Sequence, residues 1–122
     1  MFIRDLSKCR QFIAGDNTTL KELFNPREDD LKLRYSLAHA VVKPGDITHK
    51  HRLRSSSEVY YIIKGKGRMH IDDDSEEVYE GHAIYIPPNS VQWIKNIGIG
   101  DLVFICIVEP PWQAADEEVI RE

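Results

Sequence analysis

Two histidines separated by one residue, His49 and His51, precede a glutamate, Glu58, which begins an apolar segment that ends at Gly65. On a β-strand, alternate side chains point to the same side, so both imidazoles can reach one ion while Lys50 points away. Glu58 then adds a carboxylate. Two histidines and one carboxylate leave coordination positions open, which suits iron and similar divalent metals that also hold a substrate or water. The spacing predicts a metal site.

A second cluster of turn and amide residues lies further along the chain, at Gly81, Pro87, Asn89, Gln92 and Asn96. Gln92 has two interpretations, which both stay open. As a ligand, its neutral amide oxygen binds metal more weakly than an imidazole, which favours iron, manganese or nickel over tightly bound zinc. As a non-ligand, it would hydrogen-bond a substrate or a metal-bound water.

The two clusters resemble the paired motifs of the cupin superfamily. The matching positions are Gly45, His49, His51, Glu58 and Gly65 in the first motif, and Gly81, Pro87 and Asn96 in the second. Two positions depart from the pattern. Asn89 stands where the family has glycine, a mild change because asparagine tolerates left-handed turns. Gln92 stands where the family has its fourth metal ligand, a histidine.

The resemblance covers 33–112 and implies a small single-domain cupin, an all-β jelly-roll barrel (double-stranded β-helix) around a ligand pocket. Periodicity alone predicts only the all-β class, because short apolar segments are each ended by Gly, Pro or Asn and no long helix is evident. We expect an N-terminal arm with strands in 1–32, the barrel core in 33–112 and an acidic tail in 113–122. The resemblance also implies a homodimer.

Length and composition exclude several classes. The 122 residues fit one domain, and the net charge of −4 disfavours a nucleic-acid partner. The longest apolar run, Leu102–Val108, is far shorter than the roughly 20 residues that a membrane-spanning helix needs, and its continuous apolarity predicts a strand buried on both faces. The first residues lack a signal-peptide core, so we expect a cytoplasmic protein without a membrane partner.

Strand parity places Tyr60 on the same side as Glu58, which makes its hydroxyl the catalytic candidate of the pocket. The alternative is a core tyrosine whose hydroxyl is satisfied by backbone. Arg52 and Arg54 follow the histidines, near the expected mouth of the pocket. They either recognise an anionic substrate or lie in a solvated loop.

The sequence predicts a metal-dependent enzyme that acts on a small polar or anionic metabolite. The metal ligands would be His49, His51, Glu58 and Gln92. Iron, manganese or nickel is favoured, zinc is the alternative, and a dioxygenase is the first reaction to test. Two alternatives remain, because the fold does not fix the chemistry. One is a non-catalytic cupin that binds or senses a sugar-like molecule, and the other resembles a sugar-phosphate isomerase.

Overall fold

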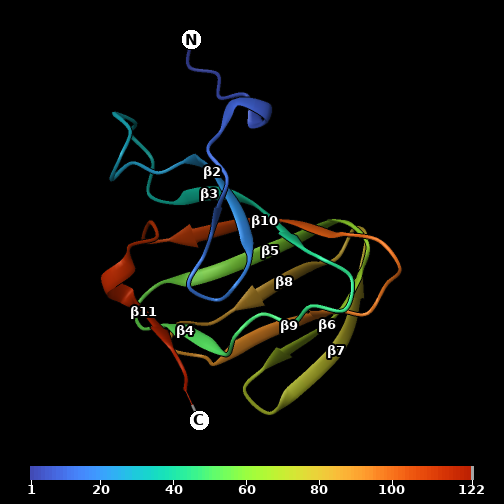
Figure 1. Ribbon diagram of the computed structural model, residues 1–122. Coiled ribbons are helices and arrows are strands. Elements are labelled where there is room, and N and C mark those ends of the chain that lie inside the picture. Colours follow the sequence, from blue (N-terminus) through green and yellow to red (C-terminus); the bar gives the residue numbers. More distant parts are fainter. Residues whose placement is uncertain (122) are drawn as a thin grey trace.

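The computed structural model describes residues 1–121, and these form two β-sheets that face each other across a core (Figure 1). The six-stranded sheet contains, in spatial order, β1 (Phe12–Ile13), β2 (Thr19–Phe24), β3 (Ser36–Val42), β10 (Leu102–Glu109), β5 (Ser57–Lys64) and β8 (Ala83–Ile86). The five-stranded sheet contains β11 (Glu117–Val119), β4 (His51–Leu53), β9 (Gln92–Asn96), β6 (Lys66–Ile71) and β7 (Asp74–Tyr79). Two short 3₁₀ turns, η1 (Leu6–Lys8) and η2 (Ala114–Asp116), complete the regular structure.

The all-β jelly roll expected from the sequence is confirmed. Every strand pairing in residues 1–121 is antiparallel, and strands distant in sequence lie side by side, as when β10 runs between β3 and β5. No helix in this part of the chain has the length and apolarity to cross a membrane.

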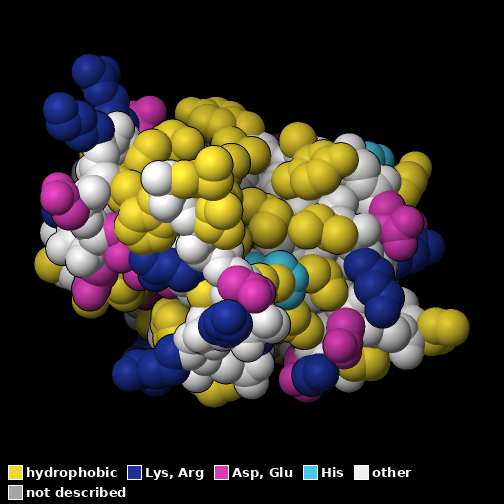
Figure 2. All heavy atoms as spheres, turned by 90° about the horizontal axis from the view of Figure 1, so that it is seen from above, with side chains coloured by type: hydrophobic (Ala, Val, Ile, Leu, Met, Phe, Trp, Pro, Cys, Tyr) yellow, Lys and Arg dark blue, Asp and Glu magenta, His cyan; other side chains and the backbone are white. Residues whose placement is uncertain are grey.

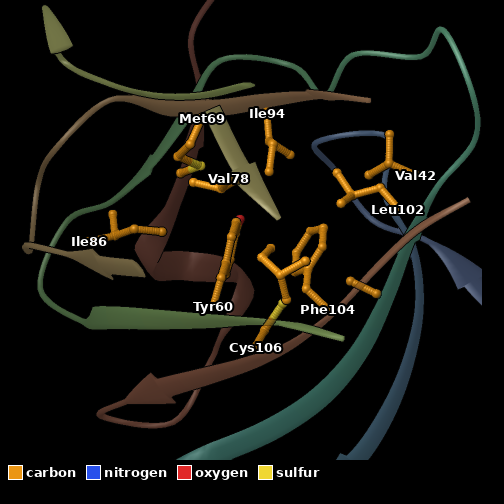
Figure 3. Close-up of a cluster of buried hydrophobic side chains, with 11 residues drawn as sticks. Val42, Tyr60, Met69, Val78, Ile86, Ile94, Leu102, Phe104 and Cys106 are labelled. Carbon is orange, nitrogen blue, oxygen red and sulfur yellow. The ribbon is translucent and has the colours of Figure 1, made fainter. Parts of the chain in front are cut away.

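The core lies between the sheets, and Figure 3 shows its side chains pointing inward from both. Tyr60 of β5 packs against Phe104 of β10 with ring centroids 4.4 Å apart. Met69 and Ile94 close the core from the five-stranded sheet. Complete burial of such a side chain contributes about 1.5 to 3 kcal/mol, so this cluster provides much of the driving force for folding.

Strand β10 is buried on one face only, whereas the sequence predicted burial on both faces. Leu102, Phe104 and Cys106 are buried, whereas Val103 and Ile105 between them are only half-buried. The strand is apolar throughout, but only alternate residues reach the core because side chains alternate between the two faces of a sheet. The other face of the strand is the outer surface of the six-stranded sheet.

Both ends of the chain are built into the sheets. The expected N-terminal arm contributes β1 and β2, and the expected acidic tail contributes β11, which pairs with β4. Glu122, the last residue of that tail, lies outside the described residues. The acidic run after Ile71 turns only at 72–73, because β7 already begins at Asp74.

Two turns depend on residues that tolerate a left-handed backbone. Asn89, which replaces the family's glycine, has φ 68°, as expected for an asparagine substituting for glycine in a turn. Gly65 has φ 92° between β5 and β6, and an added Cβ would lie 2.5 Å from the carbonyl oxygen of Asp101. Glycine is therefore required at position 65 by both conformation and space.

Candidate active site

A cavity of about 380 Å³ opens between the sheets, near the segments contributed by both chain ends. Its apolar walls include Phe12, Leu20, Leu53, Phe104, Val108 and Trp112. Its polar groups include Asp16, Glu22, His51, Glu58, Tyr60, Cys106 and Glu117. The volume is within the roughly 300 to 1,000 Å³ typical of small-molecule sites, and apolar walls with a few polar groups are their usual composition.

Four separate elements bring the ionisable groups together. Asp16 lies in the turn between β1 and β2, His51 begins β4, Glu58 is in β5, and Glu117 begins β11. The antiparallel pairing of β11 with β4 sets Glu117 opposite Leu53, two residues beyond His51. One imidazole and three carboxylates from these elements thus share the cavity with a fourth carboxylate, Glu22 of β2.

Glu58 is buried, with 8% of its surface exposed. Desolvation is the main cause that raises its pKa from 4.5 to about 7, and the carboxylates of Asp16 and Glu117 raise it further. His51 and a hydrogen bond from Gln92 act in the opposite direction, because both favour the charged form. Near neutral pH Glu58 can therefore both accept and donate a proton, as a general acid or base must.

His51 is held in one tautomer by the backbone. Its Nδ1 lies 2.9 Å from the carbonyl oxygen of His49, which can only accept, so Nδ1 carries a proton. Nε2 lies 3.6 Å from a carboxylate oxygen of Asp16 and is the atom left to exchange a proton. Burial, with 4% of the residue exposed, keeps this nitrogen out of bulk water.

Gln92 links Tyr60 to Glu58. The Tyr60 hydroxyl donates to Gln92 Oε1 over 2.9 Å, and Gln92 Nε2 donates to Glu58 Oε1 over 2.9 Å. With Oε1 accepting from the amide, a proton on Glu58 belongs on Oε2. Burial and then the Glu58 charge raise the pKa of the Tyr60 hydroxyl well above 10, so this group stays protonated.

The structure does not bring the four predicted metal ligands together. His51, Glu58 and Gln92 are buried, but His49 is exposed and does not line the cavity. The reason is local: β4 begins only at His51, so the strand alternation expected for both histidines does not apply.

The amide of Gln92 also differs from the predicted ligand arrangement, because it is engaged on both sides, by Tyr60 and by Glu58. Residues 1–121 contain no group of three or more His, Cys, Asp or Glu side chains arranged to hold a metal. The predicted ligand set therefore does not fit this arrangement. Gln92 hydrogen-bonds Tyr60 and Glu58 instead, and its second interpretation, a hydrogen bond to a substrate or a metal-bound water, stays a prediction.

Tyr60, the predicted catalytic residue, does line the cavity. Its hydroxyl is satisfied by a side chain and not by backbone, and Figure 3 shows its oxygen pointing across the core. Asp16 and Glu117 were missed by the sequence reasoning, because one lies in an expected arm and the other in an expected tail. No local motif marks either residue, and only the pairing of the terminal strands places them beside His51.

Comparison with known proteins agrees with this architecture. The family model described as "Cupin domain" matches residues 38–108. An uncharacterized protein of Methanocaldococcus jannaschii, MJ1618, is 35% identical over 117 residues, which cover 96% of this chain and 93% of the relative. A glucose-6-phosphate isomerase of Pyrococcus horikoshii is 23% identical over 119 residues, which cover 87% of this chain but 63% of the isomerase.

Among solved structures, the Streptomyces nucleoside dehydratase Pac13 superposes with a TM-score of 0.80 at 16% identity, covering 99% of this chain and 92% of Pac13. Variants of Pac13 have been solved with uridine. At this level of identity the likeness concerns the fold.

Proposed function

This chain belongs to the cupin domain family, and from that premise we propose that it is an enzyme that uses its own side chains as general acid and base. The reaction class we propose is a lyase or isomerase acting on a small hydroxylated molecule. The observation that carries the proposal is the shared cavity: Glu58 and His51 both line it, and both are buried. A carboxyl group and an imidazole that are both buried in one cavity are typical acid–base groups of catalytic sites.

The proposed lyase step is an elimination of water. The Glu58 carboxylate takes a proton from a C–H bond, whose electron pair forms a C=C bond as the C–O bond on the neighbouring carbon breaks. Protonated His51 gives the proton on Nε2 to the departing hydroxyl, which leaves as water. Glu58 then holds the extra proton, and exchange with solvent restores both groups. In the isomerase version, Glu58 returns its proton to a different carbon.

Gln92 and Asp16 support the two groups without taking part in bond changes. The amide of Gln92 fixes one oxygen of Glu58 and leaves Oε2 for the ligand. Asp16, 3.6 Å from His51 Nε2, stabilises the imidazolium form that the step requires. Because the predicted metal ligands do not meet at one point, the proposed reaction uses only these side chains.

The glucose-6-phosphate isomerase relative and the Pac13 likeness both support testing this reaction class. The rival is a binding module, which would hold the same ligand without changing it. Deuterium incorporation distinguishes the two, because an enzyme that removes a C–H proton exchanges it with solvent.

We would incubate the purified chain with sugars and nucleosides in D₂O and follow C–H signals and new alkene signals by NMR. The expected result is exchange or water loss with the wild type, reduced by about 10²-fold or more in Glu58→Gln and in His51→Asn. His49→Asn is the matched control, since His49 is two residues away but outside the cavity. Samples stripped with chelator and samples reloaded with Fe²⁺, Mn²⁺, Ni²⁺ or Zn²⁺ test the metal. Activity that requires metal and is lost in His49→Asn would overturn the proposal.

A further inference from the structure

The ionisable lining of the cavity is strongly acidic. Four carboxylates line it, and among the described residues that line it there is no lysine and no arginine. The four are Asp16, Glu22, Glu58 and Glu117. His51 is the one lining residue of the described chain that can carry positive charge, and it already faces Asp16.

These carboxylates are also poorly solvated. Desolvation is the main cause that raises the pKa of Glu22, Glu58 and Glu117. Negative charge inside this cavity is therefore already unfavourable, and an anionic ligand would add to the repulsion at low dielectric. A ligand that donates hydrogen bonds or carries positive charge would relieve it, because carboxylates can only accept.

The arginines nearest in sequence to His51 do not offset the negative charge of the cavity. Arg52 and Arg54, one candidate pair for recognising an anionic substrate, both form ion pairs with Glu118 and do not line the cavity. Neighbours on β11 alternate: Glu117 lines the cavity, and Glu118 pairs with the arginines outside it. The positive charge of these two arginines therefore lies outside the cavity, where Glu118 offsets part of it.

The apolar walls define the rest of the ligand. Phe12, Leu20, Phe104 and Trp112 line the same cavity and offer mainly carbon surface, since the Trp112 side chain already hydrogen-bonds Glu117. A ligand that fits has one apolar or aromatic face and one end that carries donors. Hydroxyl and amino groups meet that requirement, whereas phosphate and carboxylate groups do not.

We infer that the cavity accepts uncharged or positively charged organic molecules with an apolar face and hydroxyl or amino donors, and that it discriminates against their phosphorylated or carboxylated counterparts. This inference rests on the proposed function only in that both concern the same cavity. Of the polar or anionic metabolite expected from the sequence, it keeps the polar and rejects the anionic alternative, and it separates this chain from a relative named for glucose 6-phosphate.

The test compares matched ligand pairs on the full chain at pH 8 by isothermal titration calorimetry. The pairs are uridine and uridine 5′-monophosphate, glucose and glucose 6-phosphate, and 2-phenylethylamine and phenylacetate. In at least one pair, we expect the neutral or cationic member to bind at least about tenfold more tightly than the anionic member. Glu117→Gln should reduce that ratio several-fold, because it removes one negative charge from the cavity.

Glu118→Gln is the matched control, since it removes the same charge one residue away on the outer side, and it should leave the ratio unchanged. Circular dichroism and melting temperature confirm that both variants are folded. If the anionic member bound as tightly as its partner in every pair that binds, or if the cavity bound no member of any pair, the inference would be overturned. A preference for uncharged or cationic ligands without any turnover would support the inference and refute the proposed enzyme. Failure of the inference and failure of the proposed function are therefore distinguishable.

Discussion

The Tyr60 hydroxyl and the Gln92 amide oxygen are joined by a buried hydrogen bond of 2.9 Å that connects the two sheets of the barrel. Tyr60 belongs to β5 and Gln92 to β9. The amide nitrogen of Gln92 in turn donates a hydrogen bond to Glu58. Each member has a partner, so the chain of hydrogen bonds is satisfied inside the core. Loss of any one member leaves its neighbours with an unpaired buried group.

Tyr60→Phe should lower the free energy of unfolding by about 1 to 2 kcal/mol, because it leaves Gln92 Oε1 without its donor. Tyr61→Phe is the control, since the neighbouring Tyr61 is exposed and should change stability by less than about 0.5 kcal/mol. Urea denaturation measures both. A double-mutant cycle with Gln92→Met should give a loss smaller than the sum of the single changes. Strict additivity would show that the hydrogen bond contributes nothing.

Glu58→Gln should alter how stability depends on pH. The folded pKa of Glu58 is about 7 and its ordinary value is 4.5, so between these values the folded state holds a proton that the unfolded state has released. Stability is therefore full below about pH 4.5 and falls as pH rises through 7, by at most about 3 kcal/mol. The amide that replaces the carboxyl group in this variant keeps an oxygen that can accept from Gln92.

We expect Glu58→Gln to be more stable than the wild type at pH 8 and to gain little or nothing at pH 4. Chemical denaturation at pH 4, 6 and 8 measures the difference, which isolates Glu58 because the other titrating groups are common to both proteins. Glu80→Gln, a change of the same kind at an exposed site, serves as control. A difference between variant and wild type that is constant from pH 4 to 8 would contradict the raised pKa.

The two histidines of the first motif should respond oppositely to substitution. His51→Asn should abolish ligand-induced stabilisation of the protein or the deuterium exchange described above, because it removes Nε2 from the cavity. His49→Asn should leave both unchanged, since its side chain is exposed and its carbonyl, which positions His51, is kept. Equal losses from both substitutions would favour the metal site expected from the sequence. Thermal shift with and without ligand provides the measurement.

The homodimer expected from the resemblance remains a prediction, and the outer face of the six-stranded sheet is where we expect it to form. Tyr61, Ile63 and Tyr85 there are 48%, 47% and 63% exposed, and Val59 and Ile105 extend the same apolar face. Figure 2 shows hydrophobic side chains gathered on the side of the molecule where β10 and β5 lie in Figure 1. Exposed apolar areas of this kind are typical of interfaces.

Tyr61→Lys combined with Tyr85→Lys should convert the dimer to a monomer, measured by light scattering after size exclusion. Tyr79→Lys is the control, because Tyr79 is also exposed, at 53%, but belongs to β7 of the other sheet. A wild type that is monomeric across the accessible concentration range would refute the expectation.

The sequence by itself determined the class of fold and the inward direction of several site residues. Alternation along β5 put Glu58 and Tyr60 on one side, and the structure confirms that both face the interior. Asn89 was expected to adopt a left-handed turn, and it does. These features are local: side-chain alternation and turn chemistry depend on residues within a few positions of each other.

Tertiary structure alone decided the composition of the site. Whether His49 joins His51 depends on where β4 begins, and that is set by its pairing with β9 and β11. Asp16 and Glu117 enter the cavity only because strands from both ends of the chain are added to the sheets. No residue near either of them in the sequence predicts this placement. Pairing between distant strands controls which charges meet in a barrel, and those charges then set the pKa of Glu58 and the kind of ligand that can enter.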